Sequence, residues 1–202
     1  IGISNPVARD HWGDCTPAQT ACRNAPDGGT TPDADNPTAD GMEASEKILA
    51  LVTFYARNLA VPKRRDVDAP QVLAGKKVFY DSGCAACHRP KFVTRTDPAR
   101  PEHSHQLIWP YTDMLLHDMG DGLADHRPEG MADGREWRTA PLWGIGLTKV
   151  VSGHTFFLHD GRARDLLEAI LWHGGEAEAA KETVRNLPKK EREALLAFLN
   201  SL

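Results

Sequence analysis

Residues 82–88 read Ser-Gly-Cys-Ala-Ala-Cys-His, and this stretch decides how the rest of the chain is interpreted. Two cysteines that are separated by two residues and followed at once by a histidine form the attachment pattern of c-type haem. The two thiols add to two vinyl groups along one porphyrin edge, and one helical turn between the cysteines spans that edge. The next residue then directs its imidazole at the iron. We therefore predict one covalent haem c per chain, anchored by Cys84 and Cys87, with His88 as an iron ligand.

Other uses of the two cysteines fit the sequence less well. A structural zinc site needs further cysteine or histidine ligands at a second paired spacing, and the chain has no second CxxC. Cys15 and Cys22 are too far apart for a zinc knuckle. A thioredoxin-like dithiol follows a strand in a βαβ unit, whereas the residues before Cys84 predict a helix. A chance match is disfavoured because cysteine is rare and a histidine follows directly.

The apolar residues around this motif follow helical spacing. Asp68 and Pro70 predict a helix that runs to about Asp81, with Leu73 and Tyr80 on one face. A compact helix is expected over 164–173, where Gly174-Gly175 ends it. A last helix is expected from Pro188 onward. Its core face is predicted to consist of Leu195, Phe198, Leu199 and Leu202.

The chain before the motif predicts an arm and one helix. Residues 1–41 are rich in turn signals and are expected to form an irregular arm closed by a Cys15–Cys22 disulfide. A helix is predicted over 42–60, with a capping box of Asp40 and Glu43. Its apolar stripe would consist of Ile48, Val52, Tyr55 and Leu59.

Between 89 and 163 the periodicity is weak. We expect long loops there, with a short helical piece around Thr112–His117 and no strand. The fold class is thus mostly α: a class I cytochrome c-like helical domain at 68–202, with long loop insertions and an irregular N-terminal arm. Residues 1–67 would form this arm and a linker helix.

The second axial position on the iron is open to several side chains. His173 lies three residues after Ile170 and seven after Leu166, which places its imidazole on the buried face of the 164–173 helix. A buried imidazole needs a partner, and either the iron or a backbone carbonyl would serve. Met119 is the second candidate. If the position is open instead, the site would be a peroxidase-type catalytic haem or a small-ligand sensor, with His117 or His159 as an acid–base group.

Composition excludes some classes of function. The 202 residues carry a formal charge of −4, which gives no reason to expect nucleic-acid binding. No apolar run approaches the length of a membrane span. The absence of a signal peptide at Ile1 says nothing against export, because the chain also lacks an initiator methionine.

Six stretches of the sequence, taken in order, resemble one known family. They are Gly75 to Phe79 before Cys84–His88, Trp109–Asp113, Leu116–Gly120, Arg138–Gly144, His159–Arg162 and Glu168–Ala177. Together they resemble the C-terminal haem domain of the bacterial di-haem cytochrome c peroxidase superfamily, which includes MauG-like enzymes, and most closely its di-haem thiol oxidoreductase subgroup. Residues 1–67 resemble the segment that follows the first haem domain in this subgroup.

The resemblance adds expectations about the site and the function. By position, His173 matches the axial ligand that is methionine in the peroxidases and tyrosine in MauG-like enzymes, so the iron would be bound by His88 and His173. The family carries two haem motifs and this chain one, so the resemblance implies an electron relay whose partner is a redox protein or a second haem domain of the same full-length protein. It also implies a periplasmic or otherwise exported location. Whether the chain is itself an enzyme stays open, since the peroxide-reactive haem of the family belongs to the other domain.

Overall fold

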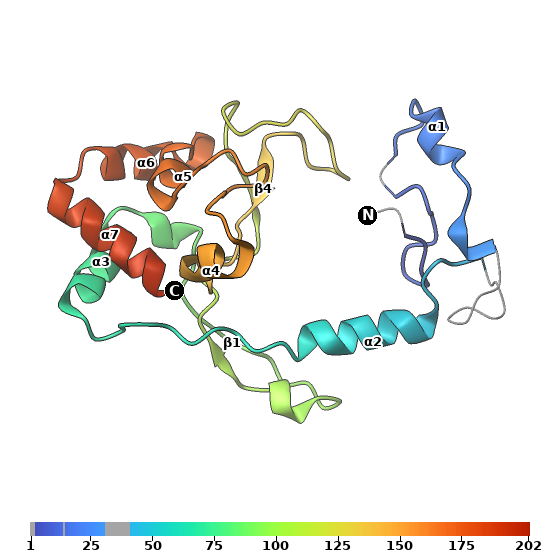
Figure 1. Cartoon of the computed structure of the whole chain (residues 1–202), viewed down its shortest axis with the longest axis horizontal. Helices are drawn as coiled ribbons and strands as arrows, with labels where there is room; N and C mark the ends of the chain where they lie inside the picture. The colour runs from blue at the N-terminus through green and yellow to red at the C-terminus, as the bar shows by residue number, and fades with distance from the viewer. Residues whose placement is uncertain (1–2, 14, 31–40) are drawn as a thin grey trace. The chain divides into compact units, whose positions relative to one another are not determined.

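The computed structural model describes residues 3–13, 15–30 and 41–202, and these divide into two compact units (Figure 1). The first unit ends at Ala60 and the second begins at Val61. The helices of the first unit are α1 (Thr20–Arg23), the 3-10 turn η1 (Gly28–Thr30) and α2 (Glu46–Arg57). The prediction that residues 1–67 form an arm after another haem domain is not tested by this division.

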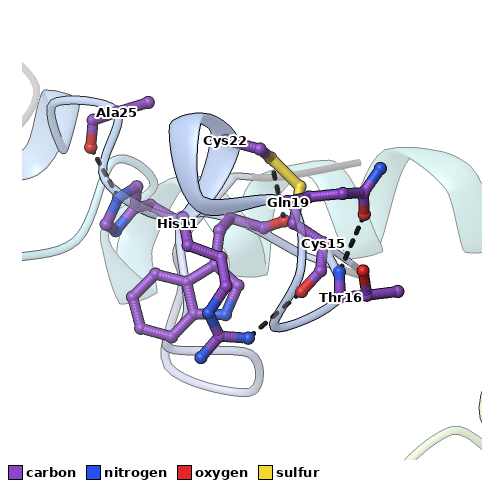
Figure 2. Close-up of a disulfide and its surroundings, with 8 residues drawn as sticks. His11, Cys15, Thr16, Gln19, Cys22 and Ala25 are labelled. Carbon is purple, nitrogen blue, oxygen red and sulfur yellow. Dashed lines mark hydrogen bonds between the residues drawn. A yellow bond between two sulfur atoms is a disulfide. The ribbon is translucent and has the colours of Figure 1, made fainter.

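A disulfide joins Cys15 to Cys22, which lies on α1, and closes the short loop between them (Figure 2). Their Cα atoms lie 6.3 Å apart. The ring of His11 forms a hydrogen bond with the carbonyl of Ala25, with 2.8 Å between Nε2 and O. The predicted pairing of these cysteines is confirmed, and it ties an otherwise irregular segment together.

Helix α2 is shorter than predicted and begins at a different cap. The Ser45 hydroxyl accepts a hydrogen bond from Ile48 N at 3.4 Å, so the helix starts at Glu46. Glu43 binds the backbone of Ser4 instead of capping the helix, and Asp40 lies outside the described residues. The predicted apolar stripe is not buried: α2 has no buried residue, and Tyr55 is 68% exposed.

The second unit contains most of the helices and all of the described strands. Its elements are α3 (Pro70–Asp81), η2 (Cys84–Ala86), β1 (Phe92–Val93), η3 (Pro101–His103), β2 (Leu107–Ile108), β3 (Leu116–Asp118), β4 (Glu136–Arg138), η4 (Ile145–Leu147), α4 (Thr148–Ser152), α5 (Leu166–Leu171), η5 (Gly175–Ala177), α6 (Glu178–Arg185) and α7 (Lys189–Ser201). Among the described residues no helix has both the length and the apolar character needed to cross a bilayer.

The core of this unit lies where α3 crosses α7 (Figure 1). Gly75 makes the close approach possible, because a Cβ at this position would lie 1.8 Å from the carbonyl oxygen of Ala194. Phe79, Tyr111 and Phe198 are buried here, with ring centroids 5.3–5.8 Å apart. The predicted core face of α7 is confirmed. Leu73 and Tyr80, which the sequence places on one face of α3, are both exposed, and the buried apolar side chains of this helix are Val72, Val78 and Phe79.

The loop region between α3 and α4 contains short strands that the sequence did not predict. β1 pairs with β2, and β3 pairs with β4, both antiparallel. The helical piece expected around Thr112–His117 is absent because Tyr111 and Met114 adopt positive φ values of 54° and 64°, which a right-handed helix excludes. The unit is nevertheless mainly helical in its regular structure, as predicted.

Candidate haem-binding site

The end of α3 positions the Cys84–His88 motif. Gly83 has a φ of 83°, a left-handed conformation that glycine adopts without strain, and it turns the chain from α3 into η2. His88 N then donates to Cys84 O at 3.0 Å and closes the turn. The geometry brings Cys84, Cys87 and His88 together on one turn, as the spacing predicts. The two cysteines are not joined to one another.

Neither thiol of the motif has the character of a reactive nucleophile. Burial raises the pKa of Cys84 to about 11, and burial together with the nearby Asp113 and Glu176 carboxylates raises the pKa of Cys87. Reactive cysteines have a lowered pKa and a positively charged neighbourhood. Both thiols are therefore protonated at neutral pH.

The His88 ring is held by the loop that follows the motif. Its Nδ1 donates a hydrogen bond to the carbonyl of Tyr111 at 3.0 Å. Burial lowers the pKa of His88 to about 4, so the ring is neutral at pH 7. With the proton on Nδ1, the Nε2 atom carries a lone pair, which is the arrangement that a metal-binding imidazole needs.

His173 repeats this arrangement from the other side. It lies just after α5, and its Nδ1 donates to the carbonyl of Ala169 at 2.8 Å. Burial lowers the pKa of His173 as well. Of the two partners considered for this buried imidazole, the backbone carbonyl is observed at Nδ1, and Nε2 has no hydrogen bond among the described residues.

The rings of His88 and His173 stand close together across an apolar cavity. Their centroids are 6.4 Å apart and their planes meet at 48°. Two imidazoles on opposite sides of one metal ion, each at a metal–nitrogen distance of about 2 Å, place their centroids about 6 Å apart. Among the residues that the structure describes, Lys181 is the one charged group in the cavity wall. The remaining lining residues are Phe79, Cys84, Leu142, Ile145, Leu166, Ala169, Ile170, Ala180, Leu195 and Leu199.

These residues fit a haem on three observations. The rings of two neutral imidazoles lie at the required separation, one cysteine of the motif lines the same cavity, and the rest of the wall is almost entirely apolar. An apolar wall suits the porphyrin face and excludes water from the metal. Covalent haem attachment by Cys84 and Cys87 and iron coordination by His88 and His173 both stay predictions.

The other candidate ligands lie away from this cavity. No methionine of the described residues lines it, and Met119 follows β3, where its carbonyl oxygen packs against Gly174. His159 stacks on Trp137 with 3.7 Å between ring centroids.

Sequence analysis missed the groups that orient the imidazoles. The acceptors at Tyr111 and Ala169 are backbone carbonyls, which every residue has, so the sequence cannot show which carbonyls bind the imidazoles. It also missed a hydrogen-bonded group next to the site, in which His117 stands between the carboxylates of Asp113 and Glu176, each at 2.9 Å. The spacing of four residues between Asp113 and His117 was a visible signal, but it was read as part of a helix.

Comparison with known proteins gives one match. A family model described as "Di-haem oxidoreductase, putative peroxidase" matches residues 1–202. Neither a curated protein nor a solved structure matches the chain. The match confirms the resemblance drawn from the sequence motifs.

Proposed function

The chain belongs to the di-haem oxidoreductase family, and from this premise we propose that it carries one covalent haem c and relays single electrons. Cys84 and Cys87 would anchor the haem, and His88 and His173 would bind its iron. The second unit would then be a class I cytochrome c-like domain. The haem supplies the one-electron chemistry, and the protein sets its position and surroundings.

The observation that carries the proposal is the pair of closely spaced imidazole rings, His88 and His173, at one apolar cavity. At 6.4 Å between centroids, His88 and His173 leave space for one metal ion between them. Each ring is held by a backbone carbonyl through its Nδ1, which leaves its Nε2 for the metal. An iron with histidines on both sides has no open position for a substrate, which favours relay over catalysis at this site and implies a fairly low reduction potential.

The protein's own residues would tune the haem in two ways. The carbonyls of Tyr111 and Ala169 hold the proton on each Nδ1 and so keep each Nε2 available to the metal. The apolar side chains of α3, α5 and α7 exclude water from the cavity. Lys181 adds one positive charge at the wall, close to His173.

The partner and the location are part of the proposal. The family is di-haem and this chain has one CxxCH motif, so we propose a second haem domain of the same protein, or a redox protein, as the electron partner. The Cys15–Cys22 disulfide supports an oxidising, periplasmic or otherwise exported location.

Absorption spectra and a pyridine haemochrome assay test the proposal. The chain should be made with intact haem-attachment machinery and compared with His173→Ala and a matched control, His159→Ala, whose ring stacks on Trp137 outside the cavity. We expect one c-type haem per chain in all three proteins, low-spin iron in the wild type and the control, and high-spin iron in His173→Ala. A low-spin spectrum that survives His173→Ala would move the ligand elsewhere. High-spin iron in the wild type would favour a peroxidase-type or ligand-sensing site instead.

A further inference from the structure

His117 links the two segments that orient the candidate haem ligands. It lies on β3, and its Nε2 is 2.9 Å from an Asp113 carboxylate oxygen. Its Nδ1 is 2.9 Å from a carboxylate oxygen of Glu176, on η5. Both ring nitrogens therefore meet acceptors, which is satisfied only when both carry a proton. We call these three residues the Asp113–His117–Glu176 bridge.

One end of the bridge reaches the loop that holds His88. Asp113 lies two residues after Tyr111, whose carbonyl accepts the His88 Nδ1 hydrogen. This loop is strained, because Tyr111 and Met114 have positive φ values. Asp113 also stabilises this loop locally, because its carboxylate accepts a hydrogen bond from Leu115 N, two residues further on, at 2.9 Å.

The other end of the bridge reaches the segment that holds His173. Glu176 lies three residues after His173, and its second carboxylate oxygen accepts a hydrogen bond from Asp118 N at 3.0 Å. The two backbones touch here, because a Cβ on Gly175 would lie 2.2 Å from the carbonyl oxygen of Asp118. β3 and the segment after α5 are thus joined by side-chain and backbone contacts together.

The bridge is charged and partly shielded from solvent. His117 and Asp113 side chains are 16% and 11% exposed, and Glu176 is the more exposed end. The hydrogen bonds to Glu176 and Asp113 raise the pKa of His117. Burial alone would raise the pKa of Asp113, but the hydrogen bonds from Leu115 and His117 outweigh it and lower that pKa. Charge-assisted hydrogen bonds of this kind are stronger than neutral ones.

We propose that His117 is a positioning residue, which through Asp113 and Glu176 holds His88 and His173 at the separation that one iron requires. The inference rests on the proposed haem ligation. His88 is adjacent to an attachment cysteine and stays with the haem whatever the bridge does. His173 has no such tether, so loss of the bridge acts on the bond between His173 and the iron.

Carbon monoxide binding measures that bond directly. Carbon monoxide reaches the reduced iron only when His173 has dissociated, so its binding rate reports the open fraction. We expect His117→Gln and Glu176→Gln each to raise this rate about tenfold, the effect of losing one charge-assisted hydrogen bond. The double variant should add little to either single variant, because both changes break the same bridge. His154→Gln, an exposed histidine that contacts Phe156, is the matched control and should leave the rate unchanged.

Haem content and circular dichroism separate the outcomes. The variants should carry one c-type haem per chain and keep the wild-type helical signal; if His117→Gln does not fold, Glu176→Gln at the more exposed end decides. Unchanged carbon monoxide rates in folded, haem-loaded variants would refute the positioning role alone. A wild-type chain without c-type haem would refute the proposed function and this inference with it.

Discussion

Gly75 is the position where one added methyl group should disturb the core and the site together. In Gly75→Ala the new Cβ would lie 1.8 Å from the carbonyl oxygen of Ala194 and 2.8 Å from Cβ of Phe198. The nearest atom belongs to the backbone of α7, so no side-chain rotation relieves the clash. Restoring an ordinary contact would separate α3 from α7 by about 1.5 Å.

The expected loss of unfolding free energy in Gly75→Ala follows from two opposed effects. Overpacking a tight core costs about 1–3 kcal/mol, and a clash with backbone belongs at the upper end of that range. Alanine is the better helix former by about 1 kcal/mol. The net loss of unfolding free energy should be about 2 kcal/mol, which for a unit of this size lowers Tm by about 6 °C.

Thermal unfolding of the haem-loaded chain, followed by circular dichroism, measures this loss. Gly122→Ala is the control, because a Cβ there meets nothing within 4 Å, and it should stay within about 0.5 kcal/mol of the wild type. The change should also speed carbon monoxide binding, since α3 leads to Cys84 while Leu195 of α7 lines the cavity. An unchanged Tm for Gly75→Ala would show that α3 and α7 do not pack as described.

Three further predictions concern pH, the disulfide and a helix cap. In the folded chain made without haem, burial lowers the pKa of His88 to about 4, whereas the unfolded chain keeps the ordinary value near 6.5. As the pH falls, the unfolded chain therefore binds a proton at His88 before the folded chain does. The free energy of unfolding should fall by about 3 kcal/mol as the pH drops from 6.5 to 4. Urea unfolding at both pH values should show that His88→Gln removes this part of the acid sensitivity, and an equal sensitivity in the variant would contradict it. Cys15→Ser should destabilise the first unit by about 2–3 kcal/mol and leave the second unit's unfolding transition in place, as limited proteolysis and calorimetry can show; a shifted second transition would argue against separate units. Ser45→Ala should cost α2 about 1 kcal/mol, visible as faster amide exchange in its first turn and nowhere else.

The parts of the fold that the sequence predicted are those set by local signals. Pro70 at the first turn of α3 and the apolar spacing of α7 mark their helices without help from the rest of the chain. The Cys84–His88 spacing is local as well. The short loop between Cys15 and Cys22 made closure feasible, and an exported location favoured the disulfide over two free thiols.

The parts that escaped prediction depend on contacts between distant segments. Periodicity cannot show whether the apolar face of α2 is exposed or buried, because the spacing of apolar residues does not show which segment packs against them. The pairing of β3 with β4 joins residues about twenty apart, and β3 is too short to show alternation. The positive φ of Tyr111 could not be predicted, because glycine is the residue that usually indicates this conformation and none stands at this position.

The same division applies to the candidate site. The attachment cysteines and His88 form one motif, whereas His173 is 85 residues further on and was reached by helix geometry and family resemblance. The carbonyl partners and the bridge at His117 appear only when the loops are placed in space. The residue types of the site can therefore be predicted from this sequence, whereas the groups that orient their side chains cannot.

Near-infrared magnetic circular dichroism of the oxidised, haem-loaded chain tests the central claim most directly. The account predicts the charge-transfer band of low-spin iron with two imidazole ligands, from His88 and His173, at one c-type haem per chain. A band of methionine sulfur on iron, or a high-spin spectrum, would contradict it.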